Sequence, residues 1–180
     1  MQQDLQNTFA LLTRTPATLD ALLRDLPEAW TSANEGPETW AIHDVIAHMN
    51  HCERVDWMRR ATIIVNAGET QPFRPLDRAA HTEESQGKSL NQLLDAFSEL
   101  RAENLKALQA LNLQAADLER RGLHPAFGPV TLSQLLATWA THDLTHLHQI
   151  SRILAHQYRE AVGPWNAYLG VLRCTGHSSS

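Results

Sequence analysis

The sequence has little of what marks several common classes of protein. It contains two cysteines in 180 residues, Cys52 and Cys174, which are too few for a disulfide framework and form no zinc-binding CxxC pair. Its 15 basic residues are outnumbered by 20 acidic ones, and this balance argues against broad nucleic-acid binding. It shows neither an apolar run as long as a membrane span nor a basic–apolar–small signal peptide. We therefore expect a cytoplasmic protein with no nucleic-acid partner and no membrane segment.

Glycine and proline are also scarce, with eight of each, and β-branched residues are sparse beside Leu, Ala, Gln and Glu. This composition favours helices. Apolar residues recur at helical spacing in four segments, which are residues 3–27, 40–67, 89–111 and 131–158. Two of these segments begin with capping-box pairs, Ser89 with Gln92 and Thr131 with Gln134. No strand pair is evident, so the sequence predicts an all-α four-helix bundle with long crossover connections.

The remaining segments interrupt or connect these helices. Pro16 lies inside the first segment and predicts a kink or an interruption there. Residues 68–88 and 112–130 show no sustained period, and we expect substrate recognition in these long connections. A short last helix is predicted over residues 165–173. Residues 1–173 would then form a single domain, followed by a disordered tail over residues 174–180.

A pair of histidines stands out in the fourth segment. His142 and His146 are four residues apart in the stretch THDLTH, so they lie one turn apart on a helix. With ten histidines in the chain, such a pair also arises readily by chance. Around the helix, His146 lies about 40° from the centre of the apolar face and His142 about 80° from it, whereas His148 falls on the opposite side. The pair is therefore predicted to point into the bundle.

The second helical segment offers a matching histidine. His48 lies on the flank of its apolar face, while His43 and His51 turn further towards solvent. Each of the two faces also carries an acid, Glu53 on the second segment and Asp143 on the fourth. A carboxylate there is costly to bury without partners.

Three inward imidazoles could together bind a divalent first-row ion and leave a position open for water or substrate. Helical bundles commonly build such sites from facing helices. The inward acids, Asp143 and Glu53, could then accept the second ring N–H of a ligand and fix its tautomer.

The same residues have a plainer interpretation. The three histidines would be core residues with ordinary hydrogen-bond partners, and the two acids would form structural ion pairs with an arginine such as Arg54 or Arg152. Cys52 is expected to be a small buried residue. Simple core packing is also the preferred interpretation of three tryptophans: Trp40, Trp57 and Trp139.

Two stretches resemble the DinB/YfiT-like metalloenzyme family. TWAIHDVIAHMNHCERVDWMRR is similar to the second-helix signature of that family, in which a Trp and a short polar opening precede an apolar helix with a His and, a turn later, an acid. GPVTLSQLLATWATHDLTHLHQISRIL is similar to its other signature, with a Val-Thr opening, His-x-x-x-His and Gln-Ile. Ala41 departs from the family pattern, which often has Ser or Thr at that position.

The resemblance implies a four-helix bundle that forms homodimers and binds a divalent metal ion (zinc, nickel or iron) through His48, His142 and His146. Relatives include S-transferases that use a low-molecular-weight thiol, so the first expectation is metal-dependent thiol transfer to a small-molecule substrate. A metal-dependent hydrolase is one alternative, because a metal can also activate water. A non-catalytic, stress-related metal-binding dimer is another. No catalytic acid or base can be assigned from the sequence.

Overall fold

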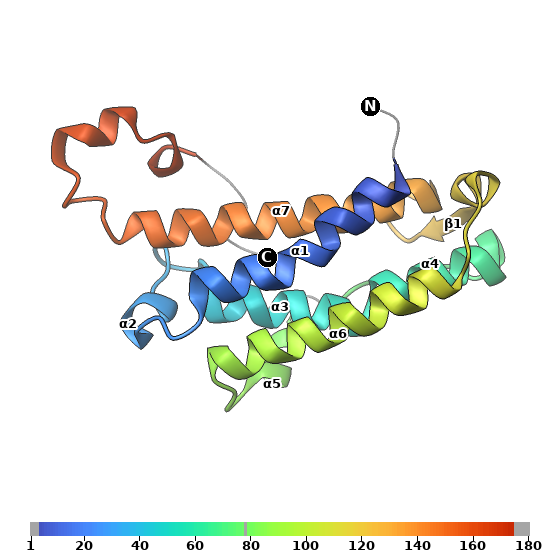
Figure 1. Ribbon diagram of the computed structural model, residues 1–180, viewed down its shortest axis with the longest axis horizontal. Coiled ribbons are helices and arrows are strands. Elements are labelled where there is room, and N and C mark those ends of the chain that lie inside the picture. Colours follow the sequence, from blue (N-terminus) through green and yellow to red (C-terminus); the bar gives the residue numbers. More distant parts are fainter. Residues whose placement is uncertain (1–3, 78, 175–180) are drawn as a thin grey trace.

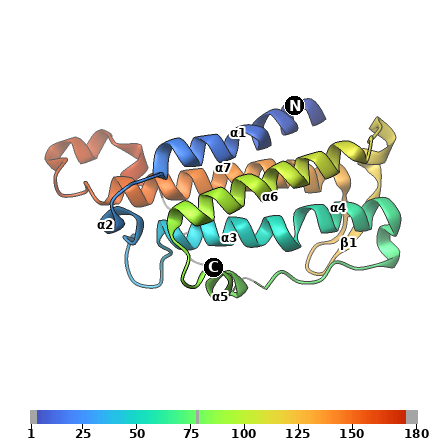
Figure 2. The same cartoon turned by 60° about the horizontal axis from the view of Figure 1, so that its bottom comes forward.

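The computed structural model describes residues 4–77 and 79–174. Long helices run alongside one another in a bundle (Figure 1), and the predicted all-α four-helix architecture is confirmed. The four segments of the bundle are α1 (Leu5–Leu23), α3 (Ile42–Val55) continued by α4 (Trp57–Asn66), α6 (Leu90–Ala110) and α7 (Leu132–His156). Two short helices, α2 (Glu28–Thr31) and α5 (Ala80–Ser85), lie in the connections, and α5 packs against α3 (Figure 2).

The helices begin where the sequence provides acceptors for their first N–H groups. Both predicted capping boxes form, at the start of α6 and of α7. At the start of α3, Ala41 has no side chain that could cap the helix. Instead, the Asp44 carboxylate accepts the backbone N–H of Ala41 at 3.0 Å, which is half of a capping box. This helix carries the first candidate ligand, so its start is fixed without the usual Ser or Thr.

The second predicted helix, residues 40–67, is not continuous. Asp56 has φ −112° and ψ −75°, and it separates α3 from α4. The Asp56 carboxylate is buried and pairs with Arg60 at 2.6 Å. Burial raises the pKa of Asp56, although the nearby charges of Arg60 and His51 oppose this shift.

The expectation of no strand pair is wrong. Part of the predicted loop 112–130 forms an antiparallel hairpin of β1 (Arg121–His124) and β2 (Gly128–Thr131). Phe73, from the connection 68–88, donates its N–H to the Leu123 carbonyl at 2.9 Å. A Cβ at Gly122 would lie 2.6 Å from the Phe73 ring and 2.8 Å from Ile64. The hairpin therefore depends on close contacts with residues far away in the sequence.

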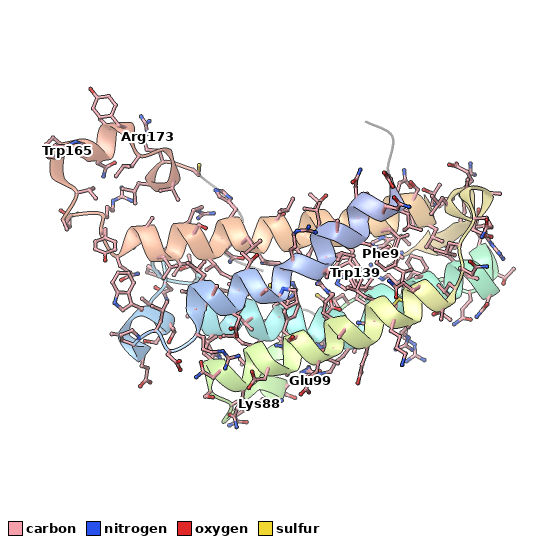
Figure 3. The ribbon with its side chains drawn as sticks, in the orientation of Figure 1. Phe9, Lys88, Glu99, Trp139, Trp165 and Arg173 are labelled. Carbon is pink, nitrogen blue, oxygen red and sulfur yellow. The ribbon has the colours of Figure 1, made fainter. Side chains whose placement is uncertain are left out.

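The predicted last helix is replaced by two short 3-10 segments, η3 (Gly163–Tyr168) and η4 (Gly170–Leu172). Gly163, at φ 51°, begins η3, and Gly170 begins η4. Gly170 therefore divides the segment that was predicted to be one helix. Trp165, in η3, is exposed, whereas Trp139 lies inside the bundle (Figure 3), and η4 packs against α7. Two further 3-10 segments are η1 (Gly68–Thr70) and η2 (Ala115–Glu119). Of the tail predicted to be disordered, all but Cys174 lies outside the described residues.

The hydrophobic core consists of two clusters, one around Trp139 and the other around Phe97. Each of the four segments also contributes a buried polar residue to one hydrogen-bonded cluster inside the bundle: Thr15 on α1, Glu53 on α3, Arg101 on α6 and Asp143 on α7. The candidate ligands are close to this cluster along the chain, since His142 directly precedes Asp143 and His48 lies five residues before Glu53. Within residues 4–77 and 79–174, none of the helices combines the length and the apolar character that crossing a bilayer needs.

Candidate metal site

The structure brings together the three histidines that the sequence singled out. Nε2 of His142 lies 3.2 Å from Nε2 of His48 and 3.1 Å from Nε2 of His146. One ring nitrogen from each of the three lies within 4.8 Å of the other two, so the group could hold a metal ion. His48 and His146 are buried and His142 is half-buried, while His148 is exposed on the far side of α7, as predicted.

The spacing of these nitrogens fits one shared cation. Nitrogens bound about 2.0–2.1 Å from a tetrahedral ion lie roughly 3.3 Å apart, close to the observed separations. Without a cation, one proton can form a hydrogen bond between only one pair of the three Nε2 atoms. The lone pair of the third Nε2 then faces another nitrogen at hydrogen-bond distance without a proton between them, which is unfavourable. The donor set therefore suits a divalent ion with a preference for nitrogen ligands.

Gln149 sets the tautomer of one candidate ligand. Its Oε1 atom accepts a hydrogen bond from Nδ1 of His146 at 2.8 Å. An amide oxygen can only accept, so the ring proton of His146 sits on Nδ1 and the Nε2 lone pair points to the other two histidines. Gln149 was not among the residues predicted from the sequence, although its position three residues after His146 on one helix is the signal that could have identified it.

The environment keeps His142 neutral. Burial lowers the pKa of His142 well below its ordinary value, and the electrostatic influence of His146, His48 and Arg101 lowers it further. Nδ1 of His142 is buried and has no hydrogen-bond partner among the described residues. A neutral imidazole is the form that binds a metal ion, so this ring is held in its ligating state at neutral pH.

Aromatic rings cover one side of the three histidines. The Trp40 ring lies 5.0 Å from the ring of His48, and it stacks on that of His146 at 6.5 Å. His81, from α5, is buried with its ring 4.9 Å from Trp40 and 5.7 Å from His48. Trp40 therefore does more than pack in the core, and a segment predicted to be a connection supplies a fourth imidazole next to the site.

Two further residues adjoin the histidines. The Trp57 ring meets the edge of the His142 ring at 5.0 Å. Cys52 is buried, as predicted, and its Sγ lies 3.6 Å from Nε2 of His48. The structure thus places a thiol beside the candidate ligands.

The placement predicted for His51 is wrong. It is 4 % exposed rather than turned to solvent, because α5 covers this face of α3. Nδ1 of His51 lies 2.9 Å from the Glu84 carboxylate, which also pairs with Arg54. Burial would raise the pKa of Glu84, but the hydrogen bonds of Arg54 and His51 outweigh it and the pKa is lowered. His43 is half-buried, with Nε2 2.9 Å from the Lys88 carbonyl.

The two inward acids are held by Arg101, which was not among the partners predicted for them. Arg101 donates to both oxygens of Asp143, at 2.6 and 2.9 Å, and to Glu53 at 2.8 Å. Ion pairing is therefore what the structure shows for both acids, but with Arg101 in place of Arg54 or Arg152. That Asp143 and Glu53 also orient a ligand ring stays a prediction. An arginine inside the apolar stripe of its helix was the signal for Arg101, since a buried charge needs a partner.

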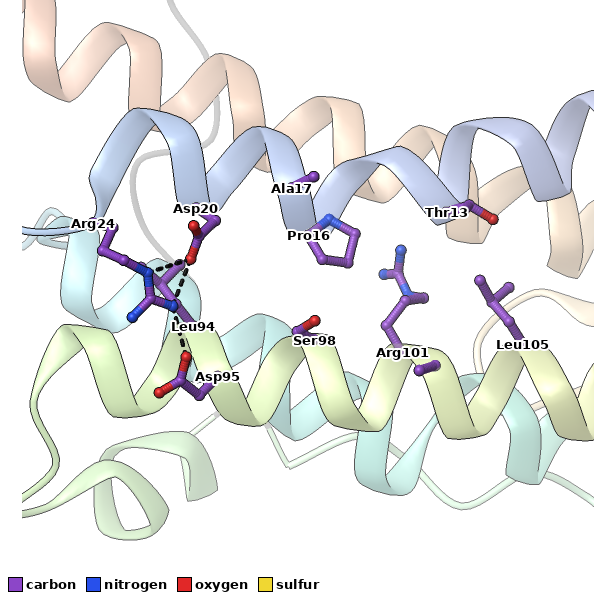
Figure 4. Close-up of a pocket in the computed structure, with 11 residues that line it drawn as sticks. Thr13, Pro16, Ala17, Asp20, Arg24, Leu94, Asp95, Ser98, Arg101 and Leu105 are labelled. Carbon is purple, nitrogen blue, oxygen red and sulfur yellow. Dashed lines mark hydrogen bonds and ion pairs between the residues drawn. The ribbon is translucent and has the colours of Figure 1, made fainter.

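Arg101 also explains how a proline is accommodated inside α1. Pro16 has no N–H, so the carbonyl of Leu12 lacks its helical donor. Nη1 of Arg101 donates to this carbonyl at 2.8 Å. Figure 4 shows Arg101 reaching from α6 towards the part of α1 that contains Pro16, beside a groove of about 420 Å³ that both residues line.

Comparison with known proteins agrees with this architecture. Residues 11–150 match the sequence model of the DinB superfamily. The structure is similar to that of YfiT from Bacillus subtilis, reported as a probable metal-dependent hydrolase with an unusual four-helix bundle topology. The TM-score is 0.73 at 18% sequence identity, over 84% of this chain and 86% of that chain, and at this identity the likeness shows the fold alone. A search of curated proteins finds no match. Because the family model spans most of the sequence, the chain belongs to the DinB superfamily.

Proposed function

We propose that this chain is a metal-dependent hydrolase whose ion is held by His48, His142 and His146. The observation that carries the proposal is the convergence of the three Nε2 atoms, from α3 and α7, at 3.1 and 3.2 Å. Nitrogen ligands of this kind suit zinc or nickel. The report of YfiT as a probable metal-dependent hydrolase supports the reaction class by analogy.

The residues around the three histidines support a catalytic rather than a purely structural site. Three imidazoles leave at least one coordination position of a divalent ion open, and an ion bound there would lower the pKa of a bound water towards 7. Gln149 holds the His146 ring with its Nε2 lone pair inward. Trp40 and the buried His81 cover one side of the site, where they exclude bulk water and can orient a small-molecule substrate.

Thiol S-transfer, the first expectation from the sequence, would use the same three ligands. It differs in needing a low-molecular-weight thiol as a co-substrate, which an open metal position would bind as the thiolate. Hydrolysis needs only water. The requirement for a thiol therefore separates the two reactions.

The experiment is a turnover assay on a panel of small esters, amides and phosphate esters. It compares zinc-loaded and nickel-loaded protein with metal-free protein, each with and without added thiol. We expect metal-dependent hydrolysis without thiol, which His142→Ala abolishes. His148→Ala is the matched control, because it removes an exposed histidine from the same helix and should keep the activity. Turnover only with thiol would favour S-transfer, and tight metal binding without any turnover would favour a non-catalytic metal-binding protein.

A further inference from the structure

The guanidinium of Arg101 joins all four segments of the bundle at one point. It extends from α6 with 1% of the residue exposed, and it donates to Leu12 on α1, Glu53 on α3 and Asp143 on α7. The faces of Phe97 and Trp139 lie 4.8 and 5.3 Å from its central carbon. Burial disfavours the charged guanidinium, but the hydrogen bond of Asp143 and the charge of Glu53 outweigh it and raise the pKa of Arg101.

The partners of Arg101 are close in sequence to the candidate ligands. Asp143 directly follows His142 and shares one turn of α7 with both histidines of the pair. Glu53 is five residues after His48 on α3. The two-pronged contact with Asp143, together with the contact with Glu53, therefore fixes the ligand turn of α7 against the ligand helix α3.

Further hydrogen bonds hold this arrangement from the side of Glu53. Trp139, one turn before His142, donates its indole N–H to Oε1 of Glu53 at 2.9 Å. Asn104 donates to the backbone carbonyl of Glu53 at 2.8 Å and to its Oε2 at 2.9 Å. Each carboxylate thus has several donors of fixed direction, so the register between α3 and α7 is tightly specified.

The charges of this cluster also suit a cation nearby. Two carboxylates, Glu53 and Asp143, face one guanidinium, which leaves a formal charge of −1 in the middle of the bundle. Each of the three side chains is no more than 3% exposed. A buried excess of negative charge is unfavourable unless positive charge lies near it, and the converging histidines adjoin the cluster.

We propose that Arg101 is a positioning residue of the metal site. It acts through Asp143 and Glu53 to hold α7 against α3 at the spacing that lets His48, His142 and His146 share one ion. The proposal rests on the metal site proposed above and adds the residue that sets its geometry. Arg101 itself is not a ligand.

The test uses Co²⁺ as the probe ion, with two measurements on the full-length protein. A chelator competition titration gives the affinity, and the visible absorption spectrum of the Co²⁺-loaded protein reports the ligand geometry. In Arg101→Lys the charge stays but the planar two-pronged contact is lost. We expect Co²⁺ binding weaker by about 10–100-fold, with a changed visible spectrum. Asn104→Ala removes the two hydrogen bonds that Asn104 donates to Glu53 and should weaken Co²⁺ binding by about tenfold. The proposal can therefore be tested even if Arg101→Lys fails to fold.

The matched control is Arg152→Lys. Arg152 is also buried on a ligand-bearing helix and donates to both oxygens of a carboxylate, that of Glu35, at 2.9 and 2.7 Å. We expect its Co²⁺ affinity to stay within about threefold of wild type and its spectrum to be unchanged. The proposal is overturned if Arg101→Lys and Asn104→Ala bind Co²⁺ like wild type, or if Arg152→Lys shows the same loss and the same spectral change. Wild-type protein that does not bind Co²⁺ would overturn both this proposal and the metal site. Binding without hydrolysis would overturn only the proposed reaction.

Discussion

Oε1 of Gln149 lies 2.8 Å from Nδ1 of His146 and accepts its ring proton across one turn of α7. Gln149 is 3% exposed, so water does not replace this contact. The hydrogen bond decides which nitrogen of His146 is free to act as a ligand. Gln149 is therefore part of the proposed metal site, although it is not one of the proposed ligands.

Gln149→Leu should weaken zinc binding by about 10–100-fold, because the His146 ring loses the acceptor that fixes its tautomer and orientation. Gln149→Glu keeps an acceptor at the same position and should bind zinc more tightly than Gln149→Leu. Chelator competition on the three proteins measures both differences. Equal affinities in wild type and Gln149→Leu would show that this hydrogen bond does not serve the metal site.

The metal-free protein should lose stability as the pH falls below about 6.5. The folded-state pKa of His142 is well below its ordinary value of 6.5, because the ring is buried beside positive charge. Between these two pKa values the unfolded chain binds a proton that the folded chain does not, so the free energy of unfolding decreases as the pH falls, by at most about 1.4 kcal/mol per pH unit for this group.

Urea unfolding of metal-free protein between pH 8 and pH 5 measures this dependence. The matched variant is His142→Gln, which removes the titrating ring and should show a smaller decrease over the same range. A wild-type free energy of unfolding that stays constant or rises towards pH 5 would contradict the expected protonation behaviour.

Gly122→Ala should destabilise the protein by about 1–3 kcal/mol through overpacking. The added methyl would lie 2.6 Å from Phe73 and 2.8 Å from Ile64, both of which are buried. Gly170→Ala is the control, since nothing lies within 4 Å of the position of its Cβ. Urea unfolding compares the two variants, and a Gly122→Ala protein as stable as Gly170→Ala would show that the hairpin does not require this close approach.

Local patterns were enough to predict the bundle and the three histidines. The capping boxes at Ser89 and Thr131 and the apolar periodicity located α6 and α7 within a residue or two. Helical periodicity correctly predicted that His146 faces inward and His148 faces outward, because both lie on one regular helix. Such features depend on residues within one or two turns, so the sequence displays them directly.

The features that the sequence did not reveal depend on contacts between distant segments. His51 is buried only because α5 packs on α3, and the sequence predicted the segment that contains α5 to be a connection without a helix. The hairpin needs Phe73 against Gly122, about fifty residues away. Arg101 finds its partners on three other segments, so periodicity can show that it faces inward but not which acid it meets.

X-ray absorption at the zinc edge of zinc-loaded protein tests the three-histidine site most directly. We predict a shell of three imidazole nitrogens at about 2.0–2.1 Å, with any further ligand being a light atom from water or substrate. Cys52 has its Sγ 3.6 Å from Nε2 of His48, so a sulfur ligand is the specific competitor. A sulfur shell near 2.3 Å, or fewer than three imidazoles, would contradict the assignment of His48, His142 and His146 as the complete set of protein ligands.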